Sequence, residues 1–381
     1  MSQEDLHTAD VKVSEKKLEP ASGKKTVQRR EWIDYARGIA TLLVVFGHVA
    51  AGFKNVAHNG APLDINYLPF ELTSVVYYAR MPLFFIISGI YIRRSFEKRG
   101  LAPFARNKFD TIFYPYLIWA TIQFIFQLIG YQYGVSNSPR EAADILYLFV
   151  RPDQMDQFWF LYALFSTSMV YALLVHFAKF SSKQILAIAS LLYIVFYYLP
   201  NEAFLFGFKY VCKFLFYLSL GDLTASYLLN EKNRPLFASL KVTAILVGLF
   251  VLIRYIMTAY DIPEYEKDFF SWQNVMLLIC IFTGLAMILN LSFAFEKFQI
   301  LKWLKVVGTY SLYIYTMHII INGIARYVIL KLTNYQVPNL ALYIVTALAI
   351  VLPIILYKLM NRAGLWFLYN PRKENAAVPV G

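Results

Sequence analysis

The chain contains about ten long apolar stretches, and this feature limits its possible folds more than any other. A helix needs roughly 20 predominantly apolar residues to cross the ~30 Å hydrocarbon core of a bilayer. Such stretches occupy residues 33–53, 74–94, 110–130, 158–178, 184–200, 209–229, 237–259, 271–291, 304–328 and 339–361. The short fifth stretch and the region around residues 301–309 are the least regular, so counts of eight or eleven spans stay open. The sequence therefore predicts an all-α polytopic bundle with about ten transmembrane helices.

Composition and charge favour a membrane protein over a soluble or nucleic-acid-binding one. Hydrophobic residues make up 59% of the 381 residues and charged residues 16%, whereas soluble domains have about 45–50% and about 25%. The formal net charge of +12 comes from Lys and Arg in alternate connecting segments rather than in one patch. Positive residues collect in cytoplasmic segments, so we expect both termini in the cytoplasm and no nucleic-acid partner.

The chain is predicted to have three parts. Residues 1–31 are polar and lack the apolar core of a signal peptide, which predicts a disordered cytoplasmic tail. Residues 32–365 form the predicted transmembrane domain, and residues 366–381 form a cytoplasmic C-terminal tail. The two cysteines, Cys212 and Cys280, lie in apolar stretches and provide neither a disulfide framework nor a metal-ligand spacing. We therefore expect no metal.

The first apolar stretch carries both an arginine and a histidine, Arg37 and His48. At about 100° per residue, the rotation about the helix axis from Arg37 to His48 ends within about 20° of where it began. Both side chains therefore lie on one face of the helix, about 16 Å apart along its axis. Asp34 lies one turn before Arg37 and is placed to orient or neutralise it. Because ionisable groups in hydrocarbon are costly, we expect both residues to point into a watery passage inside the bundle. The alternatives are an Arg37 that extends to lipid headgroups and a His48 with a purely structural role.

The second stretch also places charge inside the membrane. Arg80 is expected at a depth similar to that of His48, because this helix runs in the opposite direction. Pro82 can open space for a ligand by freeing a backbone carbonyl. Arg93 and Arg94 reach the inner surface, where they either bind phosphate groups of a donor or lipid, or simply anchor the helix.

Two further groups of side chains are candidates for substrate binding. Tyr315, His318 and Asn322 fall at i, i+3 and i+7 of a late helix and form one polar stripe. Such a stripe either contributes to a site or hydrogen-bonds a neighbouring helix. Trp159 begins the fourth span in an aromatic cluster, which is typical of an interfacial belt but also suits stacking against a sugar ring.

Four segments of the chain, in order, resemble the membrane acyltransferase-3 family, especially its sugar O-acetyltransferase branch related to fucose 4-O-acetylases. The first segment contains the Arg37 and His48 spacing, and the second contains Met-Pro-Leu-Phe-Phe followed by the basic pair Arg93-Arg94. The matching segments are residues 30–48, 81–94, 158–161 and 310–318. Together these matches extend over almost the whole chain.

The resemblance implies an integral membrane O-acyltransferase of the bacterial inner membrane. The donor would be acyl-CoA, with acetyl-CoA preferred, and the acceptor would be a sugar hydroxyl on a cell-surface or lipid-linked glycan. Membrane lipids would be the other partners. The alternative is a non-enzymatic transporter or exporter of a glycan or small molecule. Inverted repeats would favour that alternative, and no convincing repeat is visible in the sequence.

The resemblance also implies catalytic roles for several residues. His48 would remove the proton from the acceptor hydroxyl as general base, although an acyl-histidine intermediate is chemically possible. Arg80, or less favourably Asn322, would stabilise the oxyanion of the tetrahedral intermediate. His318 would position His48 or the acceptor.

The remaining candidates are binding residues. Arginines near the inner mouth suit a polyanionic donor such as CoA, because guanidinium groups bind phosphates in a bidentate manner. Aromatic and amide side chains in the outer half suit a sugar. The expected binding residues are Asp34, Arg37, Arg93, Arg94, Trp159, Tyr315 and Asn322.

Overall fold

The structure is a computed structural model that describes residues 30–58, 63, 65–66, 77–133, 136, 139–260, 262 and 268–372. Most of the tail predicted over residues 1–31 lies outside the described residues, as does the predicted C-terminal tail from residue 373 onward. Residues 31–381 form one compact unit, and the following description concerns that unit.

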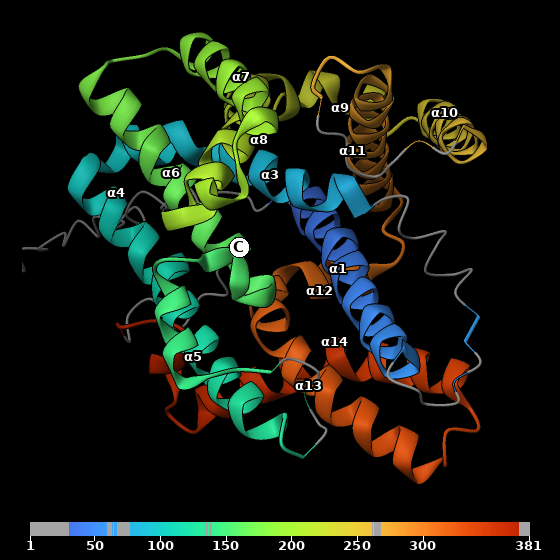
Figure 1. The fold of residues 1–381 in the computed structure, drawn as a ribbon. Coiled ribbons are helices and arrows are strands. Elements are labelled where there is room, and N and C mark those ends of the chain that lie inside the picture. The colour runs from blue at the N-terminus through green and yellow to red at the C-terminus, as the bar shows by residue number, and fades with distance from the viewer. Residues whose placement is uncertain are drawn as a thin grey trace, which may run out of the picture. The chain divides into compact units, whose positions relative to one another are not determined.

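The described residues form helices and connecting turns, and no β-strand occurs among them. The helices are α1 (Glu31–His58), α3 (Tyr77–Arg99), α4 (Leu101–Lys108), α5 (Tyr114–Gly130), α6 (Trp159–Phe177), α7 (Ser182–Tyr198), α8 (Phe208–Leu228), α9 (Arg234–Phe237), α10 (Leu240–Ala259), α11 (Trp272–Phe298), α12 (Lys302–Thr309), α13 (Ser311–Leu332) and α14 (Pro338–Arg362) (Figure 1). Short 3₁₀ turns occupy Ala142–Leu148, Pro152–Gln154, Asp156–Phe158, Asn201–Gly207, Glu231–Asn233 and Trp366–Leu368. The all-α prediction is confirmed.

Each of the ten ranges predicted to span the membrane contains a helix. Among the described residues, seven helical segments are long and apolar enough to cross a bilayer. They are Glu31–His58, Leu101–Gly130, Asp156–Phe177, Leu240–Ala259, Trp272–Phe298, Ser311–Leu332 and Pro338–Arg362. Helix α7 has 17 residues, and helices α3 and α8 carry several charged residues, which lowers their apolarity. The count of ten spans stays a prediction.

Apolar side chains lie exposed on the outer faces of several helices. On α10, Ile245, Val251 and Leu252 are more than half exposed. On α14, Val351 and Ile355 are also exposed. A soluble protein rarely leaves long helices uncovered in this way, because contiguous apolar surface favours association or membrane insertion. Together with the seven long apolar helices, this surface indicates a multi-pass membrane protein.

The predicted ninth span, residues 304–328, is not one helix. Helix α12 ends at Thr309, and α13 begins at Ser311 after the non-helical Tyr310, whose φ and ψ are −99° and 15°. Hydrophobicity alone did not indicate this break, because both sides of it are apolar. The break separates α12, which packs against α1, from the longer helix that carries His318.

A π-helical turn over Phe109–Phe113 joins α4 to α5. In this turn the Tyr114 N–H bonds to the carbonyl of Phe109, five residues back. Pro115 follows and has no N–H, so it cannot donate the usual helical bond to Thr111. Single π turns often occur at functional sites, and this one lies beside a cavity described below.

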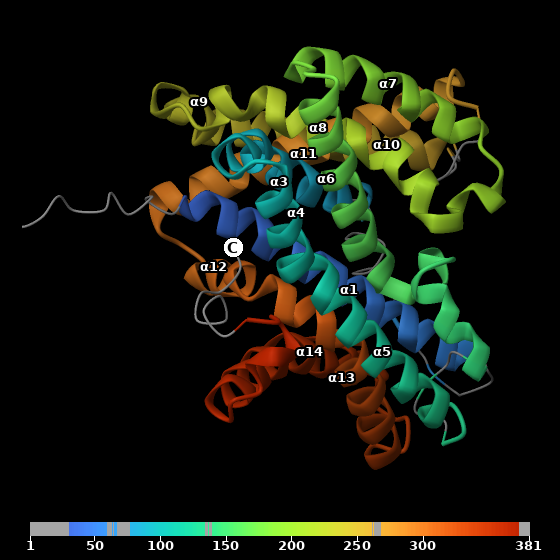
Figure 2. The same ribbon diagram turned by 90° about the vertical axis from the view of Figure 1, so that its left-hand side faces the viewer.

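Helix α1 runs through the interior of the bundle, where it contacts α3, α11, α12, α13 and α14 (Figure 2). Glycines allow its closest approach: a Cβ on Gly38 would lie 2.1 Å from the Leu304 carbonyl oxygen of α12. A second such crossing joins α3 to α8, where a Cβ on Gly89 would lie 2.0 Å from the Leu218 oxygen. Small residues permit this close packing of helices in membranes, and the two crossings fix the helices that carry Arg37 and Arg80.

Candidate active site

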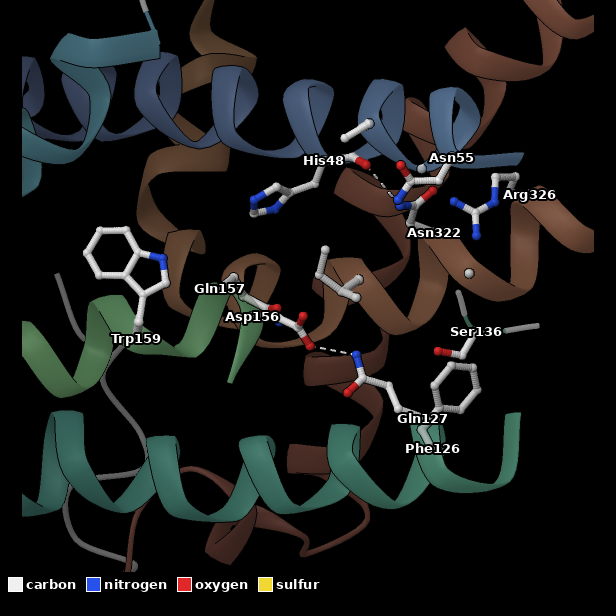
Figure 3. A pocket seen from close by; sticks show the side chains of 14 residues that line it. His48, Asn55, Phe126, Gln127, Ser136, Asp156, Gln157, Trp159, Asn322 and Arg326 are labelled. Carbon is white, nitrogen blue, oxygen red and sulfur yellow. Dashed lines mark hydrogen bonds between the residues drawn. The ribbon is translucent and has the colours of Figure 1, made fainter. Parts of the chain in front are cut away.

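Two of the cavities that the described residues line each contain one member of the Arg37 and His48 pair. The first, the His48 cavity, has a volume of about 290 Å³. It is lined by His48, Ala51, Gly52, Asn55, Phe126, Gln127, Ser136, Asp156, Gln157, Trp159, Ile319, Asn322, Gly323 and Arg326 (Figure 3). The second, the Arg37 cavity, has a volume of about 300 Å³. It is lined by Arg37, Phe84, Asn107, Lys108, Thr111, Ile112, Phe160, Leu161, Leu164, Ser311, Leu312 and Tyr315.

A partition formed by Tyr315 and Gln157 separates these cavities. Tyr315 lines the Arg37 cavity and donates its hydroxyl hydrogen to the backbone carbonyl of Gln157, which lines the His48 cavity. In this structure Arg37 and His48 therefore line separate cavities instead of the one open passage that was expected. Helical periodicity correctly placed both side chains toward the interior, but the partition comes from α13 and from the turn before α6, which are distant in sequence.

The central feature of the His48 cavity is a pair of imidazoles. The Nδ1 of His48 lies 2.8 Å from the Nε2 of His318, and the two rings are nearly parallel, at 6°. The Nδ1 of His318 lies 2.8 Å from the carbonyl oxygen of Tyr315 and 3.1 Å from that of Ile314. His318 is completely buried, whereas His48 lines the cavity.

These contacts determine the tautomers of the neutral pair. Carbonyl oxygens only accept hydrogen bonds, so the Nδ1 of His318 must carry its hydrogen and the Nε2 must accept. The Nδ1 of His48 therefore donates to His318, which leaves the lone pair of the His48 Nε2 unprotonated. No protein hydrogen bond to this Nε2 occurs within the described part of the chain. His318 thus orients a neutral imidazole whose free nitrogen is ready to accept a proton.

Two predicted oxyanion-stabilising residues lie close to the imidazole pair. Arg80 is buried, donates from Nη1 to the carbonyl of Leu43 at 3.1 Å, and interacts electrostatically with His48 and His318. Asn322 lines the His48 cavity, and its Nδ2 donates to the backbone carbonyl of His48 at 3.4 Å. Asn322 thus lies on the cavity wall, whereas Arg80 lies near the imidazole pair and lines neither cavity. The catalytic roles of both residues stay predictions.

Opposite the imidazole, the His48 cavity has a wall of amide and carboxylate groups. Asp156 Oδ2 accepts hydrogen bonds from Gln127 at 2.6 Å and from Gln123 and Arg140 at 3.2 Å. Gln123 and Gln157 also bond to each other through their amides, at 2.6 and 3.1 Å. Asp156 adopts a φ of 46°, a left-handed conformation that aspartate tolerates better than most residues. These contacts hold one carboxylate oxygen in place, and no hydrogen bond to Oδ1 occurs among the described residues.

The turn that carries Asp156 is itself anchored by a neighbouring ion pair outside the membrane-spanning segments. Arg151 donates to both carboxylate oxygens of Asp153, at 3.0 and 2.8 Å. Burial alone would raise the pKa of Asp153, but hydrogen bonds from Arg151 and Gln154 outweigh it and lower that pKa. The carboxylate is therefore ionised at neutral pH, and the pair ties the turn in place.

Trp159 lines the His48 cavity. Its ring stacks on Tyr210 at 4.9 Å and on Phe214 at 5.6 Å. A place in an interfacial belt and a role in sugar stacking both stay predictions.

The Arg37 cavity combines cationic and apolar groups. Arg37 of α1 and Lys108 of α4 line it together with the hydroxyls of Thr111 and Ser311. Apolar side chains cover the remaining wall; they are Phe84, Ile112, Phe160, Leu161, Leu164 and Leu312. The π turn after α4 contributes Thr111 and Ile112 to this wall. The cavity is thus suited to a ligand with both an anionic and an apolar part.

The other predicted donor-binding residues lie away from the cavity walls. Arg93 bonds to Asp222 of α8 at 3.3 Å and to the carbonyl of Phe180 at 3.2 Å, and Tyr171 donates to the same carboxylate. Arg93 is thus part of an interhelical ion pair, and Arg94 is exposed beside it. Both donor-binding roles stay predictions.

Asp34 is buried near the Gly308 crossing of α1 and α12, where a Cβ on that glycine would clash with the backbone of Asp34. Its proposed role in orienting Arg37 stays a prediction.

Several residues of the two cavities were not singled out from the sequence. Gln123 and Gln127 have a spacing of i and i+4 in an otherwise apolar helix, a polar stripe that could have indicated an interior site. Asp156 directly precedes the aromatic cluster of the fourth span, and Lys108 lies at the start of the third span. Arg140 gave no local signal, because its role depends on a contact with Asp156.

Apolar helices around a buried imidazole pair and two internal cavities define a polytopic membrane protein with a polar site inside its bundle. A family model described as an acyltransferase domain matches residues 30–358. The chain therefore belongs to the acyltransferase-3 family and is a membrane acyltransferase. No curated protein and no solved structure matches it.

Proposed function

We propose that this protein transfers an acyl group, preferably acetyl, from acyl-CoA to a sugar hydroxyl of a cell-surface or lipid-linked glycan. The observation that carries the proposal is the free Nε2 of His48, which faces a polar cavity while His318 holds the opposite nitrogen. A general base needs a fixed lone pair within reach of the hydroxyl. The hydrogen-bonding groups on the opposite wall suit a hydroxyl-rich acceptor.

The proposed transfer has two steps, attack on the thioester and collapse of the tetrahedral intermediate. The acceptor hydroxyl gives its proton to the Nε2 of His48 as its oxygen attacks the thioester carbonyl carbon. The resulting tetrahedral oxyanion lies near the guanidinium of Arg80, which stabilises its charge. Collapse breaks the carbon–sulfur bond, and the protonated imidazole returns the proton to the leaving thiolate. The products are a sugar ester and free CoA.

The Arg37 cavity supports the assignment of acyl-CoA as donor. Arg37 and Lys108 supply positive charge for the CoA phosphates. The apolar wall, which includes Leu161 and Leu312, suits the less polar acyl end. For acyl transfer, the thioester must pass the partition, so we propose that Tyr315 moves away from Gln157 when both substrates are bound.

Membrane orientation follows from the same proposal. Acyl-CoA is made in the cytoplasm, and the excess of Lys and Arg in alternate segments supports a cytoplasmic location for both termini. The Arg37 cavity then lies nearer the cytoplasmic face and the His48 cavity nearer the outer face. We propose a location in the bacterial inner membrane and the sugar O-acetyltransferase branch related to fucose 4-O-acetylases.

Mass spectrometry of surface polysaccharide tests the proposal whichever sugar is the acceptor. A strain that lacks the gene is complemented with the wild-type protein, His48→Ala or His176→Ala, each at matched membrane abundance. We expect the acetyl mass increment with the wild type and with His176→Ala, whose imidazole packs on Phe96 and Phe177. His48→Ala should lose it, because removal of a general base lowers the rate by about 100-fold or more.

Two results would contradict the proposed function. One is normal polysaccharide acylation with His48→Ala. The other is glycan flux across vesicles that contain the protein without any consumption of acyl-CoA, which would favour a transporter.

A further inference from the structure

Arg326 of α13 is a buried guanidinium on the wall of the His48 cavity. It is 6% exposed. No ion pair or hydrogen bond to it occurs within the described part of the chain, and the acidic group nearest in the cavity, Asp156, pairs with Arg140 instead. A buried cation without a counter-charge is costly in a membrane protein. Its low exposure also argues against an arginine that merely extends to lipid headgroups.

The surrounding residues make room for this guanidinium. Gly52 lies one turn after His48 on α1, and a Cβ there would lie 2.0 Å from the Nη1 of Arg326. Asn322 lies one turn earlier on α13, and its buried Oδ1 has no hydrogen-bond partner among the described residues. Figure 3 shows Asn322 and Arg326 on one side of the cavity and Asp156 on the other. Two unsatisfied polar groups thus line one cavity.

Arg326 also lines a second, adjoining cavity. This Lys331 cavity has a volume of about 290 Å³ and is lined by Val56, Tyr133, Arg326, Tyr327, Leu330, Lys331 and Tyr335. The shared position of Arg326, with Lys331 beyond it, gives this end of the His48 cavity a positive character. The proposed acceptor cavity therefore combines the Asp156 carboxylate, which can accept hydrogen bonds from hydroxyls, with the separate cation of Arg326.

We propose that the acceptor is an anionic sugar and that Arg326 binds its carboxylate or phosphate group while the reacting hydroxyl lies at His48. This inference rests on the proposed acyl transfer. Gly52 and His48 are about 6 Å apart along α1, so one sugar residue can reach both groups. Guanidinium binds either anion through paired hydrogen bonds, and the Oδ1 atoms of Asp156 and Asn322 accept from neighbouring hydroxyls.

Thermal unfolding of the full-length protein in lipid nanodiscs tests the anion site. The probes are sodium glucuronate, glucose 6-phosphate and glucose, at ionic strength matched with sodium chloride. A ligand that binds the folded state raises the unfolding midpoint. We expect at least one anionic probe to raise it and glucose at the same concentration to have little effect. A larger shift of the unfolding midpoint with glucuronate identifies carboxylate as the preferred anion. A larger shift with glucose 6-phosphate identifies phosphate.

Substitutions then assign the effect to Arg326. Arg326→Gln should lower the binding affinity for the anionic probe about 10- to 100-fold, because a hydrogen bond to a charged group contributes about 1.5–3 kcal/mol. Arg326→Lys should retain part of the affinity. Arg254→Gln, a change at an arginine of α10 outside the cavities, should retain all of it. An unfolding shift with acetyl-CoA that survives in Arg326→Gln shows that the variant is folded.

A second pair of variants changes the position of the guanidinium without removing it. Gly52→Ala should displace Arg326 and weaken anion binding, whereas Gly248→Ala should not, because a Cβ on Gly248 meets no atom within 4 Å. Equal shifts with glucose and both anions, or undiminished anion binding in Arg326→Gln, would overturn the inference.

The anion-binding experiments and the test of acyl transfer can fail independently. If acetylation of the polysaccharide depends on His48 but the protein binds the anionic probes no better than glucose, only the proposal of an anionic acceptor is contradicted. Anion binding that depends on Arg326, with acetylation that does not depend on His48, supports the anion site and defeats the proposed transfer.

Discussion

The His48 cavity and the Arg37 cavity have almost the same volume, about 290 and 300 Å³, but different lining groups. The His48 cavity presents oxygen acceptors, amides, an imidazole and the guanidinium of Arg326. The Arg37 cavity presents two cations and a largely apolar wall. Volume alone would not distinguish them, and the difference in lining groups is the basis for proposing the acceptor in one cavity and the donor in the other.

The partition between the cavities makes this comparison testable. Since Tyr315 and Gln157 separate them, a substitution deep in one cavity should change the KM of one substrate only. A substitution behind the reacting imidazole should instead change kcat. Substitutions that raised both KM values equally would show that the two cavities act as one site.

The largest effect is expected at His318, which touches His48 and lines neither cavity. His318→Phe removes the acceptor for the Nδ1 hydrogen of His48, so the imidazole loses its orientation. We expect kcat to fall about 100-fold or more with both KM values nearly unchanged, measured by transfer of labelled acetyl groups in nanodiscs. Partial recovery in His318→Gln, whose amide oxygen accepts a hydrogen bond, would support positioning. Equal loss in both variants together with a raised KM would contradict it.

A smaller effect is expected in the Arg37 cavity. Arg37→Gln and Lys108→Gln each remove one positive charge that faces the proposed donor. Since charged hydrogen bonds contribute about 1.5–3 kcal/mol, the KM for acetyl-CoA should rise about tenfold or more while the acceptor KM stays unchanged. Lys183→Gln, at an exposed lysine of α7, is the matched control. Unchanged affinity for acetyl-CoA in both cavity variants would remove this cavity from the donor path.

The smallest effect is expected for Asp156→Asn. The amide keeps the shape of the side chain but accepts hydrogen bonds less strongly than a carboxylate. The acceptor KM should rise several-fold, as for a net hydrogen bond of about 1 kcal/mol, and the KM for acetyl-CoA should not change. Asp153→Asn, outside the cavity, controls for loosening of the turn. An equal rise in both variants would assign Asp156 a structural role.

The fold was largely predictable because apolar length and helical periodicity are local properties. Each predicted range contains a helix, and Gly89 lies at a close helix crossing as small residues in membranes often do. The break at Tyr310 and the π turn before Pro115 were not predicted. Both features depend on the pattern of backbone hydrogen bonds, which the hydropathy of the segment does not indicate.

Spacing on one helix predicted part of the site. His48, His318 and Asn322 meet because their helices turn polar groups inward, whereas Tyr315 of the same predicted stripe lines the Arg37 cavity. Sequence reasoning could not pair Arg93 with Asp222, since that contact joins two helices that are far apart in the chain. For the same reason it missed the carboxylate wall around Asp156, and it expected a passage where side chains from distant segments meet.

The contact between Tyr315 and Gln157 has a consequence for side reactions. Water competes with any alcohol for an activated thioester, and a basic imidazole would accelerate that unproductive hydrolysis. With the contact closed, the His48 base and the thioester of the proposed donor would occupy separate compartments. Under the proposed acyl transfer, the donor would stay intact until Tyr315 moves away from Gln157.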